Sequence, residues 1–396
     1  MIRELHINNY KSLHELTLNV GRFNVFIGEN GCGKSNLLEA IALAAAAAAD
    51  KLDHEFLTSR GIRVTEPQLM RSAFSNESLL EPIEITVGFE NLDNIQKYTL
   101  TNDNQAYSKW IIREDYNIKL AKALRNWKPL SEQITKPLPK HEDKKDIKKI
   151  FSDIEIISPA ELYDLKEQLL NFTTYEDKIK NFIIYSPENT ALRNFYKEGQ
   201  IEPLGINGEG LLKLLKVIQS KSDEQRQEIH ACLQLFDWYD ELEIPKDLSA
   251  SEDKVTINDR YLTQVFDQRS ANEGFLFVLF YIALMVSDDT PKIFAIDNID
   301  TSLNPKLCTR LIKEMVPLAK KYGKQVFVTT HNPAILDGID LGDDEQRLLV
   351  VSRNKLGHTR FKRITVADKP RSSTDEDLKL SEAFLRGYLG GLPKGF

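Results

Sequence analysis

The first hundred residues show the hydrophobic patterns of β-strands, interrupted by one helix. Apolar and polar residues alternate over 16–20, as expected of a strand with one buried face. Residues 25–27 are continuously apolar, which favours a strand covered on both faces, and the Leu- and Ala-rich stretch 36–49 predicts a helix. A second alternating strand is predicted over 83–89, with 97–101 as its hairpin partner.

The chain changes character after about residue 105. Up to about residue 180 it is rich in Lys, Glu, Asp and helix-forming residues, with Pro137 and Pro139 as interruptions, which predicts a mainly helical insertion. Short apolar runs return at 182–185, 293–296 and 326–328. Because strands that alternate with helices favour a covered, largely parallel sheet, we predict an α/β fold. Its expected parts are an N-terminal lobe over residues 1–105, the insertion over 106–180 and a C-terminal lobe over 181–396.

The composition is that of an ordinary globular protein. The apolar run 276–286 is too short to cross a bilayer, and the first residues lack the layout of a signal peptide. The three cysteines, Cys32, Cys232 and Cys308, lie far apart without the spacing of a zinc site or a disulfide framework. We therefore expect a cytoplasmic protein with no membrane partner.

Charge is spread unevenly along the chain. The net charge of −7 argues against a protein that coats nucleic acid indiscriminately. Residues 109–150, however, contain twelve Lys or Arg against six Asp or Glu. This segment is either a solvated helical face or a surface for nucleic acid or an acidic partner such as a phage protein.

A phosphate-binding motif lies between the apolar run 25–27 and the predicted helix. Residues 28–35, Gly-Glu-Asn-Gly-Cys-Gly-Lys-Ser, match the pattern GxxxxGK[ST] at every fixed position. A chance match in a chain of this length is about a one-in-a-hundred event. Glycines let the backbone N–H groups face a phosphate, Lys34 would reach the β- and γ-phosphates of ATP, and Ser35 would ligate Mg²⁺. The predicted nucleotide contacts from this segment are Asn30, Gly31, Gly33, Lys34, Ser35 and Asn36. Cys32, inside the loop, is either a small spacer or a redox switch, and a switch needs a lowered pKa.

Two further strands end in polar residues suited to the same site. The run 293–296 is followed by Asp297, in the layout that places a carboxylate on the metal beside a phosphate loop. The run 326–328 leads to His331, a candidate sensor of the γ-phosphate. A polar, Gly-containing loop over 270–274 precedes the apolar helix and forms a second potential anion site. A second phosphate cradle is useful if it closes over ATP held by another subunit.

With these four elements in this order, the chain resembles ATPases of the ABC/SMC/RecF superclass. In more detail it resembles single-chain prokaryotic relatives of the OLD-family ATPases found in phage-defence and abortive-infection systems. The resemblance covers residues 1–105 and 180–396, and includes Asn-Tyr-Lys-Ser-Leu at 9–13, Ser-Asn-Leu-Leu-Glu-Ala-Ile at 35–41 and the ending 380–393. It implies a P-loop NTPase head of the ABC type with a mixed-sheet lobe at the N-terminus. It also implies site roles: Lys11 near the phosphates or ribose, Asn272 and Gly274 in the signature loop, Asp297 as the Walker B aspartate, residues 301–304 as the D-loop, and His331 as the switch histidine.

The resemblance further implies a head-to-tail dimer, or a higher oligomer, with two ATPs between each P-loop and the opposing signature loop. OLD-type proteins commonly continue into a Toprim nuclease, but only about sixty-five residues follow His331 and no suitable carboxylate cluster stands out. We therefore expect a sensor or switch subunit of an anti-phage system that controls a separate nuclease or toxin. The alternatives are a RecF-like DNA-repair ATPase, a transporter ATPase subunit and a catalytically silent scaffold.

The chain departs from this family in three places. Asn298 stands where the family has a glutamate that orients the attacking water, so we predict slow hydrolysis, with Asp300 as a candidate substitute base. Asn272 replaces the signature serine, although its amide can still donate to a phosphate. No residue is assigned firmly to the Q-loop, for which Gln68 and Asn76 are the candidates.

Overall fold

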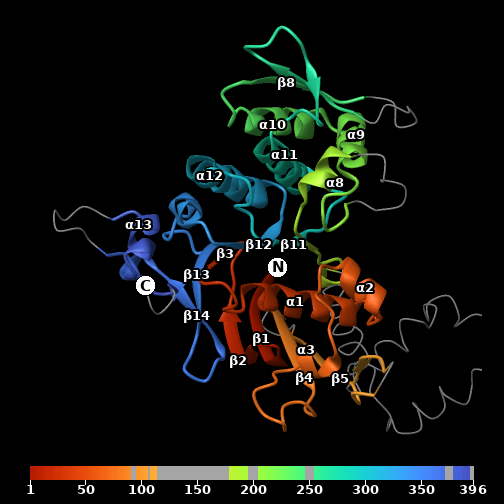
Figure 1. Cartoon of the computed structure of the whole chain (residues 1–396), viewed down its shortest axis with the longest axis vertical. Coiled ribbons are helices and arrows are strands. Elements are labelled where there is room, and N and C mark those ends of the chain that lie inside the picture. Colours follow the sequence, from red (N-terminus) through yellow and green to blue (C-terminus); the bar gives the residue numbers. More distant parts are fainter. Residues whose placement is uncertain are drawn as a thin grey trace, which may run out of the picture.

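The computed structural model describes residues 1–90, 95–105, 108–113, 178–194, 204–245, 254–370 and 378–392. Within these ranges the chain is an α/β protein built on two large β-sheets, with a third, small sheet at one end (Figure 1). Apart from residues 108–113 and 178–180, the predicted helical insertion over 106–180 lies outside the described residues.

A six-stranded sheet forms the centre of the molecule, in the order β14-β13-β3-β12-β11-β7. All neighbouring strands are parallel except β14, which runs antiparallel to β13. The predicted parallel sheet is thus confirmed, and the N-terminal strand β3 lies between strands from the C-terminal part, so the two predicted lobes share one sheet. The bounds are β3 Phe23–Ile27, β7 Ile184–Tyr185, β11 Ile293–Ile296, β12 Gln325–Thr330, β13 Gln346–Arg353 and β14 Thr359–Ile364.

The second large sheet is antiparallel and has the order β2-β1-β4-β5-β6. The predicted hairpin is confirmed, since β4 pairs with β5 and Ile85 lies opposite Tyr98. The sheet extends to β6, beyond the expected boundary of the N-terminal lobe at residue 105. Its strands are β1 Ile2–Tyr10, β2 Leu13–Asn19, β4 Ile83–Phe89, β5 Ile95–Thr101 and β6 Ile111–Ile112.

A three-stranded sheet, which the hydrophobic pattern did not predict, lies beyond α9 and α10 at the top of Figure 1. Its strands are short and mostly polar: β8 Tyr239–Glu243, β9 Thr256–Asp259 and β10 Phe266–Asp267. The helices are α1 Lys34–Ala48, α2 His54–Ser59, α3 Pro67–Met70, α8 Asn189–Arg193, α9 Leu211–Lys221, α10 Asp223–Leu233, α11 Glu273–Val286, α12 Pro305–Lys321 and α13 Leu380–Leu385, with 3₁₀ turns η2 Pro333–Gly338 and η3 Val366–Asp368. None of the helices in the described ranges has the length and apolar character needed to cross a membrane.

Different layers cover the two faces of the central sheet. Along β3, Val25 belongs to the core that contains α11 and α12, whereas Phe26 belongs to the core that contains α1 and the five-stranded sheet. Val328 and Phe327 alternate in the same way along β12, as the two-residue period of a strand requires. The helices α1 and α11 therefore lie on opposite faces of the sheet, below and above it in Figure 1.

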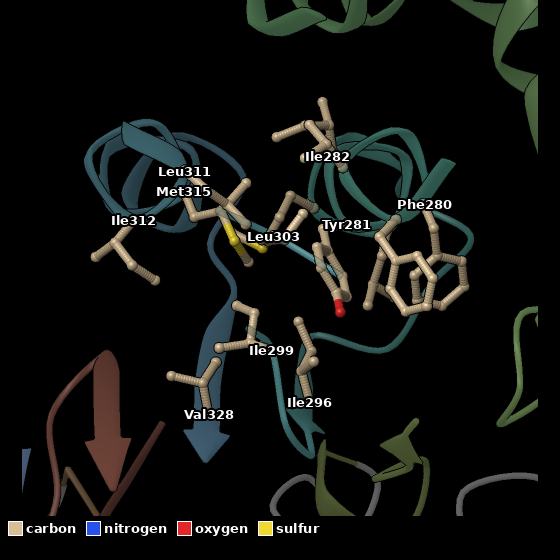
Figure 2. Close-up of a cluster of buried hydrophobic side chains, with 14 of the residues drawn as sticks. Phe280, Tyr281, Ile282, Ile296, Ile299, Leu303, Leu311, Ile312, Met315 and Val328 are labelled. Atoms are coloured by element: carbon tan, nitrogen blue, oxygen red, sulfur yellow. The ribbon is translucent and has the colours of Figure 1, made fainter. Parts of the chain in front are cut away.

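The helix α11 is buried on every side, which explains its continuous apolar sequence. It packs against α8, α9, α10 and α12. Figure 2 shows Tyr281 from α11, Leu303 from the loop after β11 and Leu311 from α12 meeting above Ile296 and Val328. The loops that follow β11 and β12 therefore rest on a closely packed core, which limits how far they can move.

One side chain joins the two large sheets. The Gln325 side chain, at the start of β12, accepts a hydrogen bond from the Ile2 backbone nitrogen (2.8 Å). Its amide nitrogen donates to the carbonyl oxygens of Ile2 and Gly21, both at 2.7 Å. Gln325 is buried, so water cannot take over these hydrogen bonds if the side chain is removed.

We predict that the Gln325→Leu substitution lowers the free energy of unfolding by about 2–4 kcal/mol, because it removes three buried hydrogen bonds to the backbone. The Ile2 nitrogen and carbonyl oxygen lose this partner, whereas the Gly21 carbonyl oxygen still accepts from Asn24 Nδ2 (2.9 Å). Urea denaturation measures this loss. The exposed Gln68→Leu variant is the matched control and should change stability by no more than about 0.5 kcal/mol. An equal loss in both variants would contradict the role assigned to Gln325.

Candidate functional site

The predicted phosphate loop connects β3 to α1, in the strand-loop-helix context that the motif requires. The Lys34 side chain is folded back onto this loop and is almost fully buried. Its ammonium donates to the carbonyl oxygens of Gly28 (2.8 Å) and Glu29 (3.0 Å). Burial lowers the pKa of Lys34, an effect that nearby acidic groups partly offset. A phosphate bound at this loop would give the Lys34 ammonium a strong anionic partner.

Two glycines of the loop, Gly33 and Gly31, differ in what surrounds them. Gly33 has φ 110°, and a Cβ at this position would lie 2.2 Å from the Thr359 hydroxyl, so only glycine fits. Thr359 Oγ1 is 2.7 Å from both Ser12 Oγ and the Cys32 carbonyl oxygen, which fastens the loop to β14. Gly31 has φ 74° with open space where its Cβ would point. The open side at Gly31 is room that phosphate oxygens can occupy.

Asp297, directly after β11, faces the Ser35 hydroxyl. Ser35 Oγ donates to Asp297 Oδ2 at 3.0 Å, and the Thr329 hydroxyl donates to Asp297 Oδ1. A hydroxyl beside a carboxylate, with phosphate oxygens nearby, is a ligand set that Mg²⁺ accepts. No cluster of three or more His, Cys, Asp or Glu occurs within the described ranges, so Mg²⁺ here would depend on these two residues, on water and on the nucleotide.

Asn298 has a left-handed backbone conformation, with φ 55°. Its backbone nitrogen donates to Thr329 Oγ1 (2.9 Å) and its carbonyl oxygen accepts from the Thr301 hydroxyl (2.8 Å), so the turn is held at both ends. Asn tolerates this conformation better than Glu does. The half-buried side-chain amide makes no hydrogen bond to any residue that the structure describes. The backbone thus gives a physical reason for an asparagine at the position where the related family carries glutamate.

The predicted sensor His331 lies beside Lys34, with its Nδ1 3.5 Å from Lys34 Nζ. Burial, and then the Lys34 charge, lower the pKa of His331, which favours a neutral imidazole. Asp300 holds this loop, because its Oδ1 accepts from Thr330 Oγ1 (2.7 Å) and from the His331 backbone nitrogen (3.3 Å). Asp300, the candidate substitute base, therefore already anchors the loop of Thr330 and His331, the predicted switch loop, through one oxygen.

Lys11 is occupied by a neighbouring carboxylate. Its ammonium forms an ion pair with the buried Glu39 and donates to the Arg63 carbonyl oxygen at 3.1 Å. Arg63 is paired with Glu39 as well (2.5 Å) and donates to Asn36 Oδ1 at 3.3 Å. A contact from Lys11 to the nucleotide stays a prediction. Glu39 and Arg63 were not predicted as part of the site; the sequence signal for Glu39 was a carboxylate within the Leu- and Ala-rich stretch 36–49.

A second contact that the sequence did not reveal joins the C-terminal strands to the phosphate loop. Arg353 Nε, at the end of β13, donates to the Gly31 carbonyl oxygen at 2.9 Å. These two residues are 322 positions apart, so no local pattern connects them.

The signature loop lies apart from this cluster. Asn272 is the N-cap of α11, and its Oδ1 accepts from the Phe275 backbone nitrogen at 2.8 Å. This leaves its amide NH₂ group available to donate. Gly274 packs closely on the D-loop, since a Cβ there would lie 3.1 Å from the Ser302 carbonyl oxygen. Within the described ranges, no hydrogen bond joins Asn272 or Gly274 to the cluster of Lys34, Ser35, Asp297 and His331.

The structure also bears on two further sequence interpretations, those of Cys32 and of the Q-loop candidates. Burial raises the pKa of the Cys32 thiol, which opposes the lowered pKa that a redox switch needs and favours the spacer interpretation. The Q-loop candidates Gln68 and Asn76 are both exposed, on α3 and in the loop after it. Their assignment stays a prediction.

A protein-family match and a curated relative cover parts of this chain. Residues 23–337 match the protein family described as "AAA domain, putative AbiEii toxin, Type IV TA system". An uncharacterised protein of Methanocaldococcus jannaschii, MJECL10, is 33% identical over 114 residues, or 27% of this chain. The match spans 50% of that relative's length.

Solved structures of SMC heads also resemble the chain. An SmcHead bound to the C-winged helix domain of ScpA matches with a TM-score of 0.53 and 14% identity, over 92% of this chain and 98% of that one. An Smc head domain with an extended coiled coil, bound to the C-terminal domain of ScpA derived from Pyrococcus furiosus, matches with a TM-score of 0.48 and 15% identity, over 92% and 96%. The first likeness confirms the predicted P-loop fold of the ABC/SMC head type.

We predict that Gly31→Ala folds but weakens ATP binding by about tenfold or more, because the added methyl group fills the open side of the loop. Gly323→Ala is the matched control, since Gly323 also has positive φ (63°) and open space but lies at the turn between α12 and β12. Both variants should lose about 1–2 kcal/mol of stability from backbone strain. Calorimetry with ATP and Mg²⁺ separates them, and unchanged affinity in Gly31→Ala would contradict the cradle.

Proposed function

Because this chain belongs to the family described as "AAA domain, putative AbiEii toxin, Type IV TA system" and has an SMC-type P-loop ATPase fold, we propose that it is an ATP- and Mg²⁺-dependent switch. The observation that carries the proposal is the convergence of four side chains from three adjacent strands of one sheet. Lys34 and Ser35 follow β3, Asp297 follows β11 and His331 follows β12. Ligands of parallel sheets bind at this carboxyl edge.

The active form we propose is a head-to-tail dimer. The P-loop helix α1 and the signature helix α11 cover opposite faces of the central sheet, and no hydrogen bond in the described ranges joins the signature loop to the phosphate loop. The Asn272 amide and the N-terminus of α11 are therefore free to meet the γ-phosphate of a nucleotide held by a second copy. ATP would then hold the two copies together.

We further propose that hydrolysis is slow. General-base help to the attacking water is typically worth about 10²–10⁴-fold, and the amide of Asn298 is a very poor proton acceptor. One oxygen of Asp300 is engaged by the switch loop, which limits its use as a replacement. A slow ATPase has a long-lived ATP-bound state, as suits a switch.

The biological role we propose is a sensor subunit in an anti-phage system of the OLD-like kind, which controls a separate nuclease or toxin. Support comes from the family, whose description names a toxin and a toxin–antitoxin system.

Dimer formation tests the switch directly. We predict that light scattering shows a doubling of mass with ATP and Mg²⁺ but not with ADP. Asn272→Asp should bind ATP normally, because aspartate caps a helix equally well, but should not dimerise, because its charge repels the partner's phosphate. Asn272→Ser, with a hydroxyl donor, should still dimerise. A monomer under all conditions would remove the proposed dimer.

Turnover tests the role of Asn298. We predict that Asn298→Glu raises the ATP hydrolysis rate by about tenfold or more, because it supplies a carboxylate base. Asn298→Gln is the matched control, since it carries the same strain at positive φ without a carboxylate. A native rate already equal to that of Asn298→Glu would refute slow hydrolysis.

The effector arrangement predicts that the purified chain leaves plasmid DNA intact with Mg²⁺ or Mn²⁺, even at stoichiometric amounts. Gel electrophoresis detects cleavage. If the chain cuts DNA and the Asp297→Asn variant cuts it equally well, the nuclease site lies elsewhere in the chain. That result would contradict a separate effector. DNA that strongly stimulates ATP turnover, with a steep salt dependence, would instead favour a RecF-like repair ATPase.

A further inference from the structure

A groove on the surface, distinct from the nucleotide site, lies between α12 and the segment that leads into α13. Its volume is about 650 Å³, in the range of pockets that hold small ligands or short peptide segments. Five cationic side chains line it: Lys306, Arg310, Lys313, Lys369 and Lys379. We refer to it as the basic groove.

Cationic side chains outnumber acidic ones in the described lining of the basic groove. Among the described lining residues the only acidic one is Asp337, and both oxygens of that carboxylate accept hydrogen bonds from Ser381, at 2.9 Å from the backbone nitrogen and 2.6 Å from the hydroxyl. Lys306, Lys313 and Lys379 are exposed and form no ion pair with any residue that the structure describes. These three side chains therefore supply exposed positive charge to the groove on a chain whose net charge is −7.

The position of these charges follows from the amphipathic helix α12. Lys306, Arg310 and Lys313 are spaced by four and three residues and so lie on one exposed face. The opposite face is buried through Leu307 and Leu311. The cations therefore form a row along the wall of the groove.

The groove is also partly apolar, which decides between two kinds of ligand. Pro305, Ala334, Ile339, Leu378 and Leu380 contribute to its lining. Surfaces that bind a nucleic-acid backbone are dominated by polar and cationic contacts to phosphates. A cationic rim around apolar lining instead matches an acidic protein segment that carries apolar anchors.

We propose that the basic groove binds an acidic segment of a partner protein, with carboxylates on the cationic row and one or two apolar side chains in the floor. Two parts of the groove lining continue the loops of the proposed nucleotide site: α12 begins directly after residues 301–304, and η2, which contributes Ala334 and Asp337, begins two residues after His331. Binding in the groove does not depend on the proposed ATP switch. Only its coupling to nucleotide rests on that proposal.

Fluorescence anisotropy with the full chain and no nucleotide tests this site. The probe is a labelled short peptide of alternating Glu and Leu, compared with a Lys-Leu peptide, an all-Glu peptide and a single-stranded oligothymidylate. We expect the Glu-Leu peptide to bind about tenfold more tightly than the other three. Equal binding of the oligothymidylate would overturn the proposal in favour of a nucleic-acid surface, and no binding of the Glu-Leu peptide would overturn it outright.

Matched variants locate the binding. Lys306→Ala/Lys313→Ala/Lys379→Ala should weaken Glu-Leu binding by about tenfold or more, whereas Lys51→Ala/Lys254→Ala/Lys355→Ala, which removes three exposed charges elsewhere, should change it by less than about twofold. Equal loss in both would show non-specific attraction and overturn the site. ATP binding measured on the same samples reports separately on the nucleotide site, so failure of one proposal is distinguishable from failure of the other.

Discussion

The carboxylate of Asp297 is the point on which the site depends. It accepts hydrogen bonds from the Ser35 hydroxyl, in the helix after β3, and from the Thr329 hydroxyl, at the end of β12. Because Asp297 itself follows β11, these bonds connect three neighbouring strands. Thr329 Oγ1 also accepts a hydrogen bond from the Asn298 backbone nitrogen, which extends the network to the loop after β11. A metal ion that entered between Ser35 and Asp297 would thus act on all three loops together.

The loop after β11 carries backbone strain next to this network. Asn298 and Ser302 have positive φ in this loop, and elsewhere Asn9 near the end of β1 and Lys11 in the turn after it have positive φ as well. Each such residue costs about 1–3 kcal/mol, which the surrounding contacts must offset. The core in Figure 2 provides that support for the loop after β11, where Ile299 and Leu303 are buried. The strained turn at Asn298 is hydrogen-bonded to Thr301, the first residue of the predicted D-loop.

The two-faced covering of the central sheet gives the dimer proposal its logic. Within the described ranges no hydrogen bond joins the N-terminus of α11 to the phosphate loop of the same chain, which leaves it open to the nucleotide of a second copy, as proposed. The basic groove is lined in part by α12 and η2, which follow the loops after β11 and β12. Nucleotide chemistry and partner docking would then share two short connecting segments.

Local patterns in the sequence determined the class of the fold, the phosphate loop, the parallel strands and the hairpin of β4 and β5, because periodicity and contiguous motifs need no knowledge of pairing. They also marked Asp297 and His331, since each directly follows an apolar strand. Only the tertiary structure decided that Ser35 meets Asp297, that Arg353 holds Gly31 and that Glu39 engages Lys11. These contacts join residues between 28 and 322 positions apart, and strand order, which no local pattern encodes, brings them together. The left-handed turn at Asn298 and the polar strands β8 to β10 likewise depend on their surroundings, because their own residues have no hydrophobic period from which to predict them.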